Sequence, residues 1–358
     1  MRFAAIFLLL LYLLPGSALA MEAEFGIDEL EKSLPPESRE IYGTLEADAS
    51  FWDEGLIKLM DWLGKNSLPA FRDAVKSGGK MLTVLVLCAA AGAISGGKTP
   101  DFVTLGGALG IAAIAAGEMD AFIGLGETTL HSMADLCTML LPCMAAAGAA
   151  AGNISSSAAM YGATVMFMDM LLQLAMGLVV PLIQIYIAAL VSRGALGDGV
   201  LNGVVGITKW LCVMSMTVLV TAFTAYFSIT GVVGTAADAA TARVTRTALA
   251  AALPVVGKIV SGAAGTVVAA ASMLRAGVGV FGLLSVLAIC AYPFLALGTH
   301  YLVYKAVAMV GSGLADNRLG GLIGGIGTAF GMVLSLVGCG AMMLFLSLVS
   351  AMKAVSYL

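Results

Sequence analysis

The amino-acid sequence predicts an all-α polytopic membrane protein, with about seven transmembrane helices after a cleaved signal peptide and a short acidic, helical, extracytoplasmic segment. The first observation is composition: of 358 residues, 60% are hydrophobic and 11% are charged, and the mean hydropathy is +1.00. These values lie far outside the range of soluble globular proteins. The second observation is the distribution of charge, because thirteen of the 22 acidic residues fall between Met21 and Lys80.

Residues 1–20 have the features of a secretory signal peptide. A basic start at Arg2 precedes the apolar run "FAAIFLLLLYLL", a helix-breaking "PG" and the small residues Ala18 and Ala20, which favour cleavage near Ala20. The apolar run has about a dozen residues, fewer than the roughly 20 that a spanning helix needs. The alternative is an uncleaved first span.

Residues 21–80 form the acidic segment, which we expect to be water-exposed. Apolar residues recur there at helical spacing and predict one amphipathic helix; they are Trp52, Leu56, Leu59, Met60 and Leu63. About sixty residues bury only a marginal core. The segment is therefore expected to rest on the membrane or on a partner.

Residues 81–358 form the predicted multi-span domain. Seven apolar runs are interpreted as spans, at 81–97, 102–117, 136–152, 158–192, 210–234, 277–298 and 320–350. The fourth run, as a straight helix, is about 52 Å long, against a hydrocarbon core of about 30 Å. Pro181 is expected to kink or divide it.

The charged residues test this topology. With the acidic segment outside, seven spans place one basic set on the cytoplasmic side, as the positive-inside bias favours: Lys98, Arg243, Arg246, Lys258, Arg275 and Lys353. They also place an acidic loop outside, with Glu118, Asp120, Glu127 and Asp135. Two outside loops, with Arg193 and Lys209 and with Lys305 and Arg318, run against the bias. If the number of spans is wrong by one, every later segment lies on the opposite side of the membrane.

Small residues four positions apart predict close packing of membrane helices. The candidate helix-packing residues are Gly106 with Gly110, then Gly257, Ser261 and Gly265, and Gly320 with Gly324. The chain has 44 glycines, so chance is the alternative for each group.

Asp169 and Gln173, one turn apart in the fourth span, are the best candidates for a polar membrane position, because an intramembrane carboxylate often lines a pathway. The alternatives are an interhelical hydrogen bond or a nearby span boundary.

Several classes of site lack support in the sequence. The six cysteines lie in apolar stretches without a CxxC pair and are interpreted as buried hydrophobic residues. His131 and His300 have no second metal-type ligand at helical spacing. The pair Gly257 and Lys258 is followed by Ile259, unlike a phosphate-binding loop, and no HExxH or GxSxG occurs. We expect no metal, no cofactor, no enzymatic activity and no nucleic-acid partner.

The order of features resembles that of the stage III sporulation protein AE family over nearly the full chain. The acidic segment contains "IDELEKSLPPE", and the residue-level likeness is concentrated between about Ala242 and Val310, in "LPVVGK", "SMLRAGVGVFG", "CAYPF" and "YKAVA". The resemblance implies a multi-span protein of endospore-forming bacteria, made in the mother cell and placed in the membrane around the engulfed forespore. It also implies membership of a channel or secretion-like complex that sustains late forespore gene expression.

The partners implied by the resemblance are small membrane proteins, ring-forming proteins, a cytoplasmic ATPase and a forespore membrane protein, together with the lipid bilayer. In this context the stretch from Arg243 to Arg275, broken at Pro254, is interpreted as a cytoplasm-facing amphipathic or re-entrant element. Its Lys258 would reach lipid headgroups or an acidic partner, as a docking or gating element. The alternative is a plain packed span with one boundary lysine.

The leading hypothesis is a non-enzymatic membrane subunit of this complex. The alternative is a stand-alone permease of small solutes, which predicts transport by the purified protein alone and a requirement for Asp169. An intramembrane enzyme would need a catalytic pair that the sequence does not offer.

Overall fold

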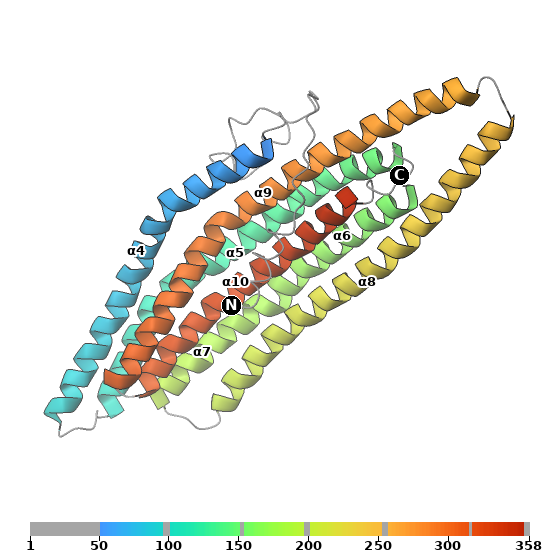
Figure 1. The fold of residues 1–358 in the computed structure, drawn as a ribbon. Helices are drawn as coiled ribbons and strands as arrows, with labels where there is room; N and C mark the ends of the chain where they lie inside the picture. The colour runs from blue at the N-terminus through green and yellow to red at the C-terminus, as the bar shows by residue number, and fades with distance from the viewer. Residues whose placement is uncertain are drawn as a thin grey trace.

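The structure is a computed structural model that describes residues 51–95, 101–150, 154–196, 201–252, 257–314 and 317–353 (Figure 1). Every regular element in these ranges is helical, which confirms the predicted all-α class. The elements are α4 (Phe51–Ile94), α5 (Asp101–Ala150), α6 (Ile154–Leu174), the π-helical turn η1 (Ala175–Val179), α7 (Val180–Leu196), α8 (Leu201–Ala252), α9 (Gly257–Leu314) and α10 (Asn317–Lys353).

Six helices in the described residues are long and apolar enough to cross a membrane, against the seven that the sequence predicts. The fourth of the predicted spans corresponds to α6, η1 and α7, which follow one another without a break. The last three predicted spans lie within α8, α9 and α10. The difference in number arises in α5, where two predicted spans belong to one helix.

The predicted acidic loop between residues 117 and 136 is helical. Helix α5 runs through Glu118, Asp120, Glu127 and Asp135 without interruption. The prediction was wrong because it treated a fall in hydropathy as the end of a helix. No proline lies between these positions, and the helix propensities of Glu and Asp cost only tenths of a kcal/mol per residue.

Helix α4 joins the end of the acidic segment to the first predicted span. It begins at Phe51 and continues past Lys80 to Ile94. The helix predicted around Leu59 is confirmed, and Leu59 is buried in a small cluster with Leu284 and Leu287 of α9. Both parts of α4, the amphipathic part before Lys80 and the apolar part after it, therefore pack against α9.

Pro181 neither divides nor ends its helix. The turn just before it, Ala175–Val179, is π-helical, and the N–H of Val180 donates to the carbonyl oxygen of Ala175. Proline has no N–H, and its ring collides with the carbonyl four residues earlier in a regular helix. A widened turn relieves this collision and keeps the chain helical.

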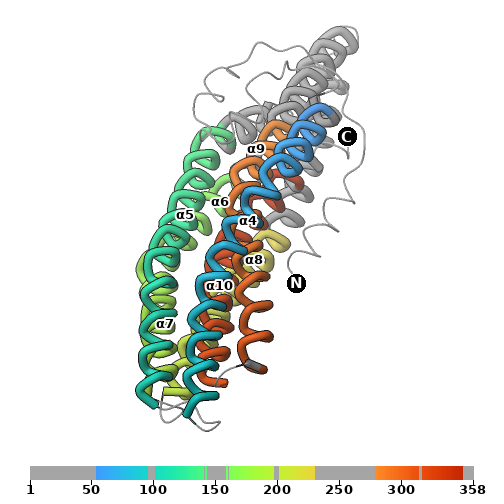
Figure 2. Tube along the Cα trace, turned by 90° about the vertical axis from the view of Figure 1, so that its left-hand side faces the viewer, coloured from blue at the N-terminus to red at the C-terminus, as the bar shows by residue number. Residues whose placement is uncertain are grey.

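Helices α9 and α10 form the centre of the bundle. In their most apolar windows 72% and 67% of residues are buried, against 28–33% in the other four spans. Figure 1 shows α4 along one side of the bundle and α8 along the opposite side, and Figure 2 looks from the side of α4. The outer helices thus present most of their surface to lipid or to partners.

The helices exceed the thickness of a bilayer. At 1.5 Å per residue, the 52 residues of α8 and the 58 of α9 extend roughly 78 and 87 Å, against a hydrocarbon core of about 30 Å. A large part of the bundle must therefore stand outside the hydrocarbon.

Merging two predicted spans in α5 also revises the predicted topology. The last turns of α4, α7 and α9 and the first turns of α5, α8 and α10 lie at the same end of the bundle (Figure 1). Arg193 and Arg318 lie in two of these turns, whereas seven spans had put these residues on the opposite side from Lys98. Six alternating helices would bring Lys98, Arg193 and Arg318 to one side. They would also move a second basic set, Arg243, Arg246, Lys258, Arg275 and Lys353, to the other side, so the count by itself does not remove the conflict with the positive-inside bias.

Candidate functional site in the helix core

A polar cluster joins α4, α5 and α9 inside the bundle. The Ser77 Oγ lies 2.6 and 2.5 Å from the two carboxylate oxygens of Glu118 and 2.7 Å from the hydroxyl of Tyr304. The Tyr304 hydroxyl also donates to Glu118 Oε2. Ser77 and Tyr304 are buried, and Glu118 is half-buried. Three helices are thereby connected through one carboxylate.

Small residues in α4 allow this approach. Next to Ser77, a Cβ on Gly78 would lie only 2.6 Å from a methyl carbon of Val303 in α9. A side chain there would push the two helices apart and separate Ser77 from Tyr304. The sequence "SGG" at 77–79 therefore supplies both the hydroxyl and the space that brings it to its partners.

The cluster can hold more hydrogen bonds than its hydroxyls alone supply. Ser77 and Tyr304 each carry one hydroxyl proton, and an ionised Glu118 only accepts. If both hydroxyls donate to Glu118, their 2.7 Å contact with each other has no proton of its own. A side chain that brings a hydrogen-bond donor of its own to position 118 would supply the missing proton, and all three contacts could then be hydrogen bonds.

Aromatic rings enclose Tyr304. Its ring centroid lies 5.0 Å from that of Phe330 in α10 and 6.3 Å from that of the buried His300. Phe122 of α5 packs against both His300 and Phe330, with centroids 4.5 and 5.1 Å away. Nδ1 of His300 lies 2.8 Å from the carbonyl oxygen of Ala296. These contacts make His300 part of the packed core.

Lys305 connects α9 to α10 one residue after Tyr304. Its Nζ donates to the carbonyl oxygen of Gly324 and to Thr328 Oγ1, both at 2.7 Å. An ammonium within a span is costly unless polar groups satisfy it, and a carbonyl and a hydroxyl do so here. Within the described residues, no group of three or more metal-type ligands is close enough to hold a metal ion.

Gly320 and Gly324 lie in the contact between α9 and α10. A Cβ on Gly320 would lie 2.9 Å from the backbone nitrogen of Ser312, and one on Gly324 would lie 3.2 Å from the Cβ of Ala308. Gly321 and Gly325, on another face of α10, lie close to Arg193 and Leu190 of α7. The glycines of α10 thus let two neighbours approach.

The pair Gly106 and Gly110 behaves differently. A Cβ on Gly106 would meet nothing within 4 Å, and one on Gly110 would make only ordinary contact with Val84, at 3.7 Å. The close approach occurs at Gly107, whose Cβ would lie 2.6 Å from the sulfur of Cys88. The tight contact in α5 is therefore displaced by one residue from the predicted pair.

Asp169 and Gln173 lie on the outer surface of the bundle. Gln173 Nε2 donates to Asp169 Oδ2 at 2.7 Å, and both side chains are exposed. The pair therefore faces away from the helix core. In this position it offers a polar contact to a neighbour more readily than a lining for an internal path.

Gly257, Lys258, Ser261 and Gly265 belong to the first turns of α9. The contacts of these four residues, and all of residues 253–256, lie outside the described part of the chain. The docking hypothesis for Lys258 therefore stays a prediction.

Sequence reasoning did not find the Ser77, Glu118 and Tyr304 cluster. Glu118 was assigned to a loop, which hid the one available signal, a carboxylate within a spanning helix. Nothing in the spacing of Ser77 and Tyr304 links them, because they are 227 residues apart.

Comparison with known proteins identifies a family. The family model for stage III sporulation protein AE matches residues 57–354, which reach from the first turns of α4 to the end of α10. No curated protein and no solved structure matches the chain.

Proposed function

Because the chain belongs to the stage III sporulation protein AE family, we propose that it is a non-enzymatic, multi-pass membrane subunit of a channel or secretion-like complex between mother cell and forespore, required for late forespore development. The observation that carries this proposal is the family match over residues 57–354. Of the six long apolar helices in the described residues, it covers five completely and α4 from residue 57 onward.

The proposed location is the mother-cell membrane around the forespore, with the acidic N-terminal segment outside the cytoplasm. The proposed partners are the other membrane and ring-forming subunits of the complex, a cytoplasmic ATPase and a forespore membrane protein. Large apolar side chains such as Phe71, Ile207 and Trp210 are exposed on α4 and α8. Exposed apolar patches mark contact with lipid or protein, which supports the proposal that these helices contact other subunits.

The test is to delete the gene in its native host and to follow sporulating cells by microscopy with a late forespore reporter. Arrest after engulfment, with a dim or collapsing forespore, is the expected result. Normal spores together with a defect in growth or solute uptake would contradict the proposal and favour a permease.

Two variants separate these functions in the complemented strain. Asp169→Asn is expected to leave sporulation unchanged, because Asp169 bonds Gln173 on the outer surface; a permease that uses this carboxylate would lose transport.

Lys258→Glu is expected to lower spore yield if Lys258 docks an acidic partner. Wild-type spore yield and complex assembly with Lys258→Glu would count against that docking role.

A further inference from the structure

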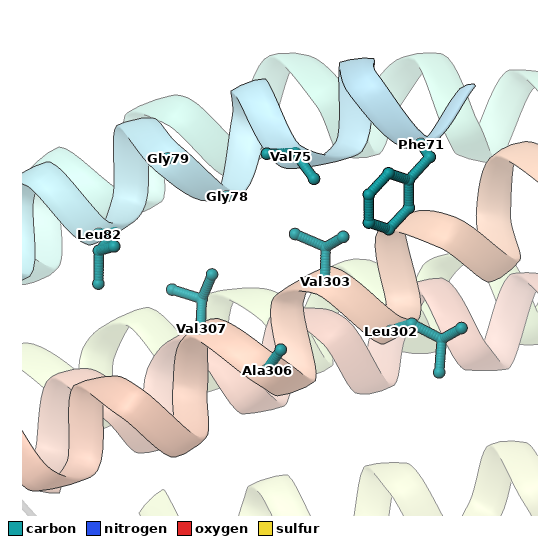
Figure 3. Close-up of a pocket in the computed structure, with 9 residues that line it drawn as sticks. All are labelled: Phe71, Val75, Gly78, Gly79, Leu82, Leu302, Val303, Ala306 and Val307. Atoms are coloured by element: carbon teal, nitrogen blue, oxygen red, sulfur yellow. The ribbon is translucent and has the colours of Figure 1, made fainter. Parts of the chain in front are cut away.

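A groove lies between α4 and α9 on the surface of the bundle (Figure 3). Its volume is about 410 Å³, and all nine residues that line it are apolar or glycine. Phe71, Val75 and Leu82 form the α4 side, and Leu302 and Val307 form much of the α9 side. This volume falls within the range of small-molecule sites, and a whole partner helix would need a longer surface.

Two adjacent glycines create the groove. Gly78 brings α4 against Val303, where a Cβ would lie 2.6 Å from a methyl carbon. One residue later, a Cβ on Gly79 would meet nothing within 4 Å. The helices therefore touch at Gly78, and the missing side chain of Gly79 leaves the neighbouring space open.

A basic stripe borders the groove. Arg72, Lys76 and Lys80 are spaced four residues apart and share one face of α4, next to the face of the groove residues Phe71 and Val75. All three are exposed, and none forms an ion pair within the described part of the chain. The exposed carboxylate of Asp73 lies on the same side of α4, three residues before Lys76. This flank of the groove therefore carries three positive charges and one negative charge, and its net charge attracts an anion.

The groove also lies where α4 changes character. Lys80 is the last charged residue of the helix, and residues 81–94 carry no charge. Such a change marks the boundary between water and hydrocarbon, where basic side chains attract anionic headgroups. Most of the α4 lining of the groove precedes Lys80, and only Leu82 lies beyond it. The groove therefore lies at the level of the headgroups and ends at the edge of the apolar part of α4.

We propose that this groove is a binding site for an anionic phospholipid, with the phosphate against Arg72, Lys76 and Lys80 and one acyl chain along the groove toward Leu82. Apolar lining selects the chain, and the basic stripe selects the headgroup. The site ties α4 to α9 at the membrane surface. It does not depend on the proposed sporulation role.

Native mass spectrometry of the purified full-length chain in detergent tests the site. The probes are phosphatidylglycerol and phosphatidylcholine with identical acyl chains. Wild-type protein is expected to retain one phosphatidylglycerol in preference to phosphatidylcholine. Gly79→Leu fills the open space and should lower the retained fraction on the order of tenfold. Gly64→Leu is the matched control, because a Cβ on Gly64 also meets nothing within 4 Å and lies outside the groove.

The charge of the stripe is tested separately. Lys76→Gln and Lys80→Gln should each weaken phosphatidylglycerol retention on the order of fivefold and leave phosphatidylcholine retention unchanged. Equal retention of the two lipids by wild-type protein, or equal retention by Gly79→Leu and Gly64→Leu, would overturn the proposal. A dimer that Gly79→Leu dissociates would also overturn it, since a second copy would then occupy the groove.

Discussion

Gly320 of α10 lies directly against the backbone of Ser312 in α9. A Cβ at Gly320 would lie 2.9 Å from the Ser312 nitrogen, 3.1 Å from its Cα and 3.3 Å from the carbonyl oxygen of Ala308. Membrane helices gain little from the hydrophobic effect when they associate in lipid, so close packing and polar contacts hold them together. This contact joins the two central helices near the end of α9 and the start of α10.

Gly320→Ala is predicted to destabilise the bundle. The atoms that a methyl group would meet belong to the backbone, which cannot rotate away as a side chain can. Forced overpacking of this kind costs about 1–3 kcal/mol. Thermal unfolding of the purified protein in detergent measures the loss. Gly313→Ala is the control, because a Cβ there meets nothing within 4 Å; equal stability of the two variants would contradict the prediction.

Two neighbouring glycines of α5 are predicted to respond differently to the same change. Gly107→Ala should lower stability by about 1 kcal/mol or more, because its Cβ would lie 2.6 Å from the Cys88 sulfur and 3.1 Å from Leu319. Gly106→Ala should be neutral or stabilising by up to about 1 kcal/mol, since alanine favours helix and the site is open. The same unfolding assay decides between them, and a larger loss at Gly106 would support the original pair.

The two glycine regions show what sequence spacing can and cannot predict. Spacing of four identifies residues on one face of a helix, and in α10 that face does meet α9 at Gly320 and Gly324. In α5 the spacing alone could not say which face meets α4, and the contact lies at Gly107. Face selection depends on how neighbouring helices are rotated, which a single helix does not encode.

The polar cluster shows a second limit. Apolar composition was sufficient to predict an all-α membrane protein and to locate most of its helices. The contact of Ser77 with Tyr304 depends on α4 and α9 being neighbours, and helix order within a bundle cannot be derived from the periodicity of separate helices. Treating the charges of α5 as a loop removed Glu118 from the candidates altogether.

Substitutions at Glu118 are predicted to separate hydrogen bonding from charge. Glu118→Ala removes the acceptor that Ser77 and Tyr304 share and leaves only the contact of their two hydroxyls with each other. One hydroxyl proton is then left without an acceptor, which costs about 1–3 kcal/mol. Glu118→Gln keeps an acceptor oxygen and adds N–H donors, so it should remain close to wild-type stability. Thermal unfolding in detergent compares the variants.

Tyr304→Phe serves as the second arm of that experiment. It removes one donor to Glu118 and keeps the ring against Phe330. Tyr304→Phe should lower stability more in the wild-type protein than in Glu118→Ala, because the hydroxyl has already lost the Glu118 carboxylate in that variant. Additive losses in the double variant would show that the two residues do not interact.

Six alternating helices predict the sidedness of the connections. In a cysteine-free background, single cysteines at Lys98 and Gly197 lie in the α4–α5 and α7–α8 connections, and both should react with a membrane-impermeant thiol reagent from the same side. The seven spans predicted from the sequence would put these two positions on opposite sides, because they add one crossing within α5. Labelling of intact cells and of inverted vesicles distinguishes the two arrangements. A cysteine at Asp316, between α9 and α10, should react from the same side as the first two. If the cysteines at Lys98 and Gly197 react from opposite sides, α5 crosses the membrane twice, and the acidic residues from Glu118 to Asp135 form the loop that the sequence predicts.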